Sequence, residues 1–309
     1  PHYHARETAV MYAKNCNAVC LLGSATPDLE SRYRAAQGKW SYIHLPERIL
    51  AHRQSVQSQM DRLTAGGAIP RHSAYRPLSD LAETTELPEV HVVDMRQELK
   101  AGNRSIFSRR LQENLKQVLD ANQQAILFLN RRGTATYVFC RNCGLTLKCP
   151  RCDIPLTYHT EPVSNTASAQ ALYCHRCGYR RNNPKTCPEC GSQHIRHYGT
   201  GTERVEDEVQ ALFPQARTLR WDYETTRQKG AHEAILHHFS THQADVLIGT
   251  QMIAKGLDLP FVTLVGIILA DAGLALPDLR AGERAFQLLT ECSCSAGRSP
   301  KCGPSIIQP

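Results

Sequence analysis

Two cysteine-rich stretches decide how this chain folds: CRNCGLTLKCPRC at Cys140–Cys152 and CHRCGYRRNNPKTCPEC at Cys174–Cys190. They hold eight of the chain's 13 cysteines, arranged as four CxxC pairs. A CxxC turn directs two thiolates at one centre, so two turns complete a tetrahedral zinc shell. The stretches therefore predict two structural zinc sites, because a full thiolate shell leaves no open position for water or substrate. Glycines suited to such turns follow three of the pairs (Gly144, Gly178 and Gly191).

The spacing between the pairs favours a nested arrangement of the two zinc ions. Only five residues separate Cys143 from Cys149, whereas 21 residues separate Cys152 from Cys174 and give the chain room to return. The inner zinc then takes Cys149, Cys152, Cys174 and Cys177, and the outer zinc takes Cys140, Cys143, Cys187 and Cys190. The alternative arrangement is a cross-braced pairing of the four turns. A less favoured alternative is that a histidine (His159 or His175) replaces one thiolate ligand. Least favoured is a cluster of disulfides in place of the metal sites.

The composition is that of a folded protein with about two domains. The chain has 309 residues, of which 41% are hydrophobic and 21% charged, with a formal net charge of +7. Eight thiolates and two zinc ions would reduce this charge to about +3, which allows a nucleic-acid partner without requiring one. The chain contains no run of 18 apolar residues and no visible signal peptide, so we expect no membrane span and a cytoplasmic location.

Apolar strands alternate with helices on both sides of the cysteine-rich stretches. The pattern predicts strands at 89–95, 124–130, 195–198, 217–222, 244–249 and 262–270, and helices at 108–121, 203–213, 229–241 and 279–290. Ser108 is the expected N-cap of the first helix. This alternation predicts an α/β fold with a parallel, doubly wound sheet, into which the two-zinc module is inserted.

The ends of the chain follow a different pattern. Ala18–Gly23 (AVCLLG) is expected to be the last strand of another α/β domain, followed by a short helix. We therefore divide the chain into the end of a first lobe (1–45), a linker or insertion (46–87), a second lobe (88–139 and 193–298) interrupted by the zinc module (140–192), and a truncated or atypical tail (299–309).

Five short motifs follow one another in a characteristic order. They are GSATP at 23–27, FLNRRG at 128–133, GTGTE at 199–203, GTQMIAKGLD at 249–258 and DLRAGERAFQLLT at 278–290. In this order, with a double zinc module between the second and the third, the chain resembles the primosomal protein N′ (PriA) family of superfamily-2 DNA helicases from about Tyr3 to Thr290. The resemblance implies RecA-like lobes that clamp ATP between them and move along single-stranded DNA.

The resemblance also implies roles for individual residues. It assigns DNA contacts to Ser24, Thr26, Arg131, Arg132, Thr250, Gln251 and Lys255, nucleotide contacts to Gly256 and Asp258, and the arginine-finger position to Arg298. GTGTE opens a helix and is either an anion site or a capping box formed by Thr200 and Glu203. Asp94 is expected to cap a turn.

The chain departs from the family pattern in two places. It contains neither a GxxxxGK[ST] phosphate loop nor an acidic DExH segment, and Ser295 stands where the first arginine of the family's last motif is expected. We therefore expect ATP and Mg²⁺ to bind only in a full-length protein, and this chain alone not to hydrolyse ATP.

The resemblance implies a bacterial, nucleoid-associated, ATP-dependent 3′ to 5′ DNA helicase that acts in replication restart and primosome assembly at stalled forks. Its implied partners are single-stranded and forked DNA, primosome and replication-restart proteins, and single-stranded DNA-binding protein. The alternatives are a non-enzymatic zinc and lobe-2 module that binds DNA or proteins, and a degraded gene product.

Overall fold

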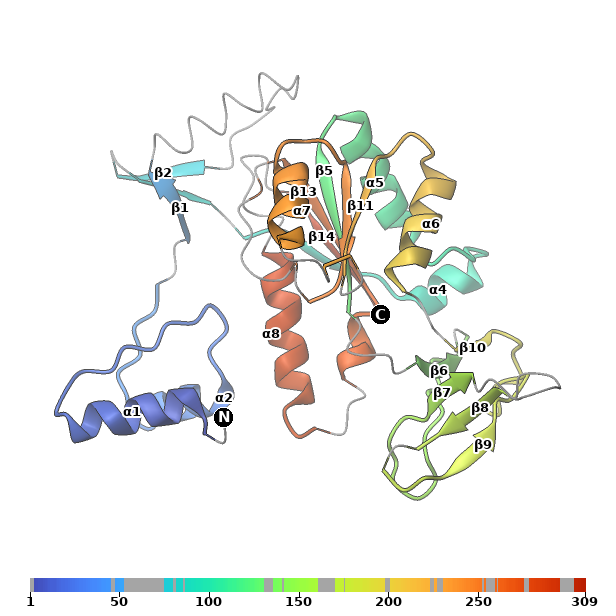
Figure 1. The fold of residues 1–309 in the computed structure, drawn as a ribbon, viewed down its shortest axis with the longest axis horizontal. Helices are drawn as coiled ribbons and strands as arrows, with labels where there is room; N and C mark the ends of the chain where they lie inside the picture. Colours follow the sequence, from blue (N-terminus) through green and yellow to red (C-terminus); the bar gives the residue numbers. More distant parts are fainter. Residues whose placement is uncertain are drawn as a thin grey trace. The chain divides into compact units, whose positions relative to one another are not determined.

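The computed structural model describes residues 3–45, 48–52, 75–79, 82–85, 87–130, 136–140, 142–160, 170–174, 176–197, 201–222, 225–226, 230–251, 253, 259, 261–274, 278–294 and 303–309. The chain forms two compact units, Pro1–His44 and Leu45–Pro309. The larger unit contains a parallel α/β sheet and a small cysteine-rich module, both visible in Figure 1. The α/β fold class predicted from the sequence is confirmed.

A six-stranded parallel sheet, here called the lobe sheet, forms the centre of the larger unit. Its order is β11 (Thr218–Trp221), β12 (Val246–Gly249), β5 (Gln124–Leu129), β13 (Val262–Ile268), β14 (Ser305–Gln308) and β4 (Val90–Val92). All neighbouring strands pair in parallel. The middle strands β5, β12 and β13 are buried along their whole length, as expected of strands covered on both faces.

Helices cover both faces of the lobe sheet. α5 (Arg109–Asp120) and α6 (Thr202–Leu212) share one apolar cluster with Ala125, Leu127 and Leu129 of β5. α7 (Ala231–Ser240) and α8 (Ala281–Ser293) share the other with Ile126 and Phe128. Alternate residues of β5 thus point to opposite faces, which is the period of a strand. The predicted helices and the doubly wound arrangement are present, with small changes at their ends.

Ser108 connects the first helix of the lobe to its last strand. Its hydroxyl accepts a hydrogen bond from the backbone N–H of Leu111 (3.2 Å), so it caps α5 as predicted. The backbone N–H of Ser108 donates to Oε1 of Gln308 in β14 (3.0 Å). Residues 303–309, expected to be an atypical tail, therefore contribute a strand between β13 and β4.

Two strands near the edges of the lobe differ from the sequence expectation. β4 ends at Val92, because the carboxylate of Asp94 accepts the backbone N–H of Arg96 (2.9 Å) and starts α4 (Met95–Lys100). The residues Ile195–His197 form β10, which pairs with the cysteine module rather than with the lobe sheet. A three-residue strand carries too little apolar pattern to reveal its partner.

The cysteine module (136–197) is built on a five-stranded antiparallel sheet. The order is β10 (Ile195–His197), β6 (Thr136–Cys140), β7 (Thr157–Thr160), β8 (Gln170–Tyr173) and β9 (Arg180–Asn182). The pairing of β6 with β10 joins the two ends of the module, because Cys140 lies opposite Ile195. This pairing places the entry and exit of the inserted chain side by side, beside the lobe in Figure 1.

The N-terminal unit consists of two helices in its described residues 3–45. α1 (Ala5–Asn15) and α2 (Leu29–Ala36) are joined by ion pairs of Arg6 with Asp28 and of Arg34 with Glu7. The strand expected at Ala18–Gly23 is wrong for this structure, since these residues are not in a strand. A strand needs neighbouring strands to accept its hydrogen bonds, and the described part of this unit supplies none.

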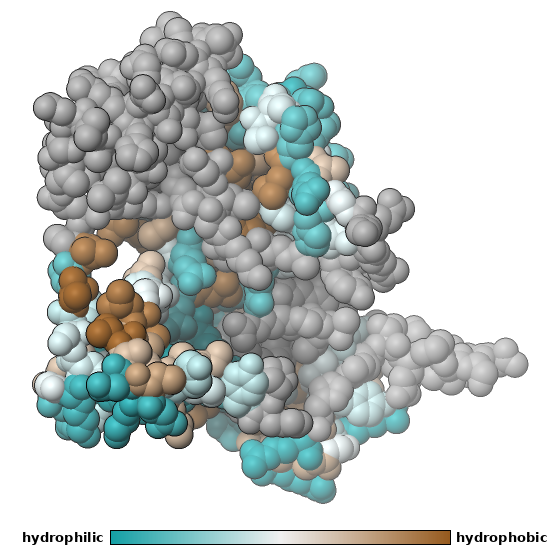
Figure 2. All heavy atoms as spheres, turned by 60° about the vertical axis from the view of Figure 1, so that its left-hand side comes forward, coloured by the Kyte–Doolittle hydropathy of each residue, from teal (hydrophilic) through white to brown (hydrophobic). Residues whose placement is uncertain are grey.

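The same stretch carries exposed apolar side chains. Val19 is 87% exposed and Leu21 is 84% exposed, although the sequence expectation placed both in a buried strand. Hydrophobic side chains also reach the surface in the view of Figure 2. Apolarity alone therefore did not determine burial in this unit.

Further strands occur in the region expected to be a linker. β1 (Arg48–His52), β2 (Tyr75–Ser79) and β3 (Ala82–Thr85) form an antiparallel sheet in the order β1-β3-β2. No helix among the described residues has the length and apolarity needed to cross a bilayer.

Candidate metal centres and nucleic-acid interface

The structure gathers the eight paired cysteines into two groups of four. Cys140, Cys143, Cys187 and Cys190 form one group, and Cys149, Cys152, Cys174 and Cys177 form the other. Within each group all sulfur atoms lie within 4.8 Å of one another. The grouping is the nested one, in which the second and third CxxC pairs face each other and the first and fourth face each other.

The distances within the groups suit a tetrahedral metal shell. The sulfur atoms are 3.6 Å apart in the pairs Cys140–Cys190, Cys143–Cys187 and Cys149–Cys177. Around zinc, with Zn–S bonds of about 2.3 Å, tetrahedral sulfur ligands lie about 3.8 Å apart. The four thiols of each group therefore fit a structural zinc ion with little movement.

Each CxxC pair lies in the same backbone turn. In the first, the N–H of Gly144 donates to the carbonyl of Cys140 (2.9 Å), and the N–H of Cys140 donates to the carbonyl of Leu145 (2.8 Å). The same two bonds recur at Cys149, Cys174 and Cys187. Because this turn needs a positive φ, glycine follows three of the pairs, and Gly144 has a φ of 81°.

Asp153 takes the place of glycine in the second turn. Its φ is 53°, its N–H donates to the carbonyl of Cys149 (2.9 Å), and its carboxylate pairs with Lys148 (3.2 Å). The glycines mark only three of the four turns in the sequence. Aspartate tolerates the left-handed conformation better than most residues, which is the signal that identifies this fourth turn.

The thiols of each group strongly affect one another's ionisation. The backbone N–H of Ser192 and the side-chain amide of Asn142 lower the pKa of Cys190 to about 6. The neighbouring sulfur of Cys177 raises the pKa of Cys152 to about 12. Four thiolates this close repel one another, so all four ionise together only around a cation.

The remaining candidate ligands lie outside these two groups. Cys16, Cys20, Cys292 and Cys294 belong to neither group, and Cys302 and His175 are outside the described residues. His159 lies in β7, but its side chain is outside the part of the chain that the structure describes. Among the described residues, each group is thus made of thiols alone.

Polar residues follow the strands of the lobe sheet at their carboxyl ends. Asn130 follows β5, Thr250 and Gln251 follow β12, and Asp222 follows β11. Parallel strands end at one edge of their sheet, so these residues share an edge, which is where ligands of open α/β sheets bind. The side-chain nitrogen of Gln251 is buried and has no hydrogen-bond partner among the described residues. This edge is the candidate nucleic-acid interface.

Six of the predicted DNA and nucleotide residues fall outside the described residues. They are Arg131, Arg132, Lys255, Gly256, Asp258 and Arg298. Their predicted roles stay predictions, although Arg131 directly follows Asn130 at the candidate interface.

Ser24 and Thr26 lie in the N-terminal unit, in the loop before α2. The backbone N–H of Thr26 donates to the hydroxyl of Ser24 (3.1 Å), and Thr26 is buried. Asp28 caps α2 by accepting the N–H of Ser31 (3.0 Å). The structure thus gives Ser24 a local role in the turn, and the predicted DNA contact remains a prediction.

The start of α6 decides one alternative left open by the sequence. The helix begins at Thr202 with Gly201 as its N-cap, so the capping box of Thr200 and Glu203 is wrong. Glu203 instead pairs with Arg220 (3.1 Å), and the hydroxyl of Thr202 donates to the carboxylate of Asp222. Gly199 and Thr200 lie outside the described residues, so the anion site stays a prediction.

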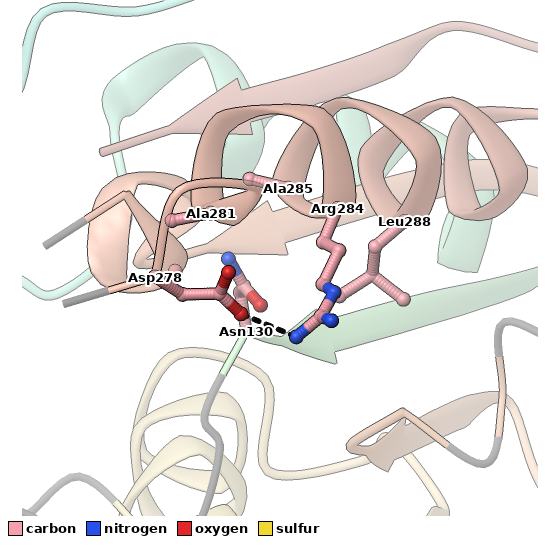
Figure 3. Close-up of a pocket in the computed structure, with 7 residues that line it drawn as sticks. Asn130, Asp278, Ala281, Arg284, Ala285 and Leu288 are labelled. Carbon is pink, nitrogen blue, oxygen red and sulfur yellow. Dashed lines mark hydrogen bonds and ion pairs between the residues drawn. The ribbon is translucent and has the colours of Figure 1, made fainter. Parts of the chain in front are cut away.

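A small pocket at the carboxyl edge of the sheet contains an ion pair that the sequence analysis missed. Asp278 and Arg284 bond at 2.5 Å, and Figure 3 shows them converging beside Asn130. Asn130 is 2% exposed and donates through its side-chain amide to the carbonyl of Ala270 (2.8 Å). Polar residues at a strand end and a helix start were the available signals, and the sequence analysis quoted both stretches without assigning these residues a role.

Comparison with known proteins covers the whole chain. The chain is 46% identical to replication restart protein PriA of Bacillus subtilis over 308 residues, which is 100% of the length of this chain. The same protein of Synechocystis is 43% identical over 308 residues, and that of Haemophilus influenzae is 35% identical over 308 residues.

The chain is similar to PriA proteins along its whole length. The matches cover 100% of this chain for the Bacillus and Synechocystis proteins and 99% for the Haemophilus protein. The chain itself spans only about a third of these relatives: 33% of the Bacillus and Synechocystis sequences and 36% of the Haemophilus sequence. No family model matches the chain. The solved Pyrococcus furiosus Hef helicase domain aligns at a TM-score of 0.29 and 15% identity, over 64% of this chain and 25% of that one, which is too low to carry an argument.

Proposed function

We propose that this chain provides a motor lobe and a zinc module of an ATP-dependent 3′ to 5′ DNA helicase that acts in replication restart. The observation that carries the proposal is the match of the whole chain to proteins named replication restart protein PriA, together with the order of its motifs. A non-enzymatic module that only binds DNA or proteins is not favoured, because that match runs through the motor motifs as well as through the cysteines.

Both cysteine groups bind structural zinc in this proposal. Thiolates are the ligands that zinc prefers in closed sites, and four of them leave no position for a reacting molecule. The metals hold the antiparallel module together at its base and at its tip. Forked DNA and replication-restart proteins, including single-stranded DNA-binding protein, are the proposed partners of the complete protein, and its location is cytoplasmic.

DNA contacts lie at the carboxyl edge of the lobe sheet. Thr250 and Gln251 offer a hydroxyl and a buried amide nitrogen without a partner among the described residues, and both suit phosphate oxygens. Arg131, Arg132 and Lys255 supply positive charge for DNA phosphates. Ser24 and Thr26 supply hydroxyls for DNA within the N-terminal unit. Gly256, Asp258 and Arg298 face the nucleotide when both lobes are present. ATP hydrolysis requires the phosphate loop and Mg²⁺ of a full-length protein.

The test of the DNA path compares two glutamines at opposite ends of β12. Gln251 follows β12 at the carboxyl edge, and Gln243 precedes it at the amino edge. We expect Gln251→Ala to weaken binding of a fluorescent oligothymidylate about tenfold, since one hydrogen bond to a charged group contributes about 1.5 kcal/mol or more. Gln243→Ala should leave the affinity unchanged. Anisotropy titrations measure both variants.

Two outcomes would contradict the proposal. Equal effects of the two substitutions would remove the carboxyl edge as the DNA path. DNA-dependent ATP hydrolysis by the purified chain, with contaminating helicases excluded, would contradict the assignment of the ATP site to parts that this chain lacks.

A further inference from the structure

The pocket beside Asn130 presents an arginine whose orientation is fixed. Arg284 is the fourth residue of α8, and its side chain is 49% exposed. Its Nη1 donates to Oδ2 of Asp278 (2.5 Å), and Figure 3 shows this bond among the residues that line the pocket. Oδ1 of Asp278 accepts the backbone N–H of Arg280 (2.9 Å). Both oxygens of Asp278 are therefore engaged, which holds the carboxylate and, through it, the guanidinium.

The geometry leaves one edge of the guanidinium available. A guanidinium offers two forks of paired donors, and the fork made by Nε and Nη2 lies away from Nη1. No described residue accepts a hydrogen bond from Nε or Nη2 of Arg284. A planar fork of two N–H donors matches two oxygens of a phosphate group.

Small side chains keep the pocket open. Gly273, Ala281 and Ala285 line it together with Asn130 and Leu288. A Cβ atom at Gly273 would lie 3.5 Å from both the Asn130 amide nitrogen and the Ala285 Cβ, so alanine fits there without a clash and narrows the space. Gly273→Ala is therefore a gentle probe of whether anything enters the pocket.

We infer that Arg284 binds a phosphate group through its Nε and Nη2, with Asp278 as its positioning residue. The phosphate belongs to the backbone of single-stranded DNA, because nucleotide binding is expected only of a full-length protein, and binding of a nucleoside triphosphate is the other outcome of the test. The inference rests on the proposed function, because the pocket lies at the same carboxyl edge as Thr250 and Gln251. It adds to that function a contact from α8, on the side of the sheet opposite α5 and α6.

The experiment titrates a fluorescent oligothymidylate and a fluorescent ATP analogue separately against the zinc-loaded chain. We expect Arg284→Gln to weaken binding of the oligothymidylate about tenfold, which corresponds to about 1.4 kcal/mol. The slope of log affinity against log salt should fall by about 0.7, because one phosphate contact is lost. Weaker binding of the ATP analogue with an unchanged DNA titration would instead assign the phosphate to a nucleoside triphosphate and overturn the DNA contact.

Asp278→Asn tests the positioning role. The substitution keeps Arg284 but removes the carboxylate charge that positions its guanidinium. We therefore expect about threefold weaker binding of the same ligand, with an unchanged slope of log affinity against log salt. Tighter binding by Asp278→Asn would show that the carboxylate repels the ligand, and would overturn the positioning role. Gly273→Ala should weaken the same ligand by a few-fold and leave the melting temperature unchanged.

The matched control is Arg217→Gln at the other edge of the sheet. Arg217 also pairs with an aspartate, Asp245, at 2.5 Å, but at the amino ends of β11 and β12. It should change neither titration at a temperature where all variants are folded. Equal affinities of wild type and Arg284→Gln for both ligands would overturn the inference. If Gln251→Ala still weakens DNA binding in the same experiment, the proposed function survives that result.

Discussion

The lobe sheet and the cysteine module are stabilised in different ways. The lobe has two apolar clusters, one on each face of its sheet, with fully buried side chains such as Phe128, Phe239 and Leu111. The module has one cluster of ten buried residues, of which four are cysteines. A module of about 60 residues buries a small apolar surface and is only marginally stable from that burial. Apolar burial therefore stabilises the lobe, whereas the proposed metal ligation supplies what the module's small core does not.

The largest effect should follow from removing one thiol of the inner group. Cys149→Ser is expected to release one of two zinc ions and to disorder the tip of the module, because structural zinc contributes about 10 kcal/mol or more to folding. Metal content of the purified protein measures the first effect, and hydrogen exchange measures the second.

The exposed thiol of Cys16 provides the control, because it belongs to neither group. Cys16→Ser should retain both zinc ions and full protection in the module. Loss of both metals from Cys149→Ser would instead show that the two sites bind cooperatively.

A smaller effect should follow from a cavity in the lobe. Phe128→Ala is expected to lower the free energy of unfolding by about 3–5 kcal/mol, because Phe128 is fully buried in β5. Urea denaturation followed by tryptophan fluorescence measures the change, since Trp221 lies in the same cluster. Phe286→Ala, at a side chain that is 67% exposed, should stay within about 0.5 kcal/mol. Loss of zinc from Phe128→Ala would contradict the separation of the two regions.

The ion pair at the amino edge of the lobe sheet should contribute less, and in a pH-dependent way. Burial acts to raise the pKa of Asp245, but the hydrogen bonds from Arg217 outweigh it and hold that pKa below its usual value. The imidazole of His242 also lies near this carboxylate, with its Nε2 3.9 Å from Oδ1 of Asp245. Because the folded pKa is the lower one, the pair stabilises the lobe at neutral pH and loses this contribution as the pH falls below about 4.

Asp245→Asn is therefore expected to cost about 1–2 kcal/mol at pH 7 and progressively less in acid. Denaturant titrations at several pH values measure the difference from wild type. A difference that stays constant from pH 7 to pH 3 would exclude the carboxylate charge as its cause. The zinc content should be equal in both proteins at pH 7.

The smallest expected effect belongs to the helix cap. Ser108→Ala removes the hydroxyl that accepts the N–H of Leu111, and should cost about 1 kcal/mol of lobe stability. Thermal unfolding measures it, with Ser240→Ala at the exposed end of α7 as the control. A cost above about 3 kcal/mol would indicate that the bond from the Ser108 backbone to Gln308 is lost as well.

Much of the lobe could be predicted because its strands and helices are recognisable locally. Short apolar runs gave β5, β12 and β13, and a serine before an amphipathic stretch gave the start of α5. The spacing of the CxxC pairs gave the grouping of the thiols, because the lengths of the intervening chain limit which turns can meet. All of these signals can be recognised from the order and spacing of residues along the chain.

The errors arose where distant residues decide the outcome. Ala18–Gly23 is apolar enough for a strand, yet a strand forms only beside another strand. Ile195–His197 pairs with β6 in the module, and Ser305–Gln308 pairs between β13 and β4, because partners far along the chain present free backbone groups there. Three or four residues carry too little pattern to identify such partners.

The sequence by itself determined the α/β class, the two sets of four cysteines and the similarity to PriA proteins. Each follows from spacing and order along the chain, which local geometry translates directly into turns, strands and ligands. Only the tertiary structure decided that Asn130, Asp278 and Arg284 meet at one pocket. Asn130 is separated from Asp278 and Arg284 by about half of the chain, and only the parallel arrangement of the strands and the packing of α8 bring the three to the same edge of the sheet.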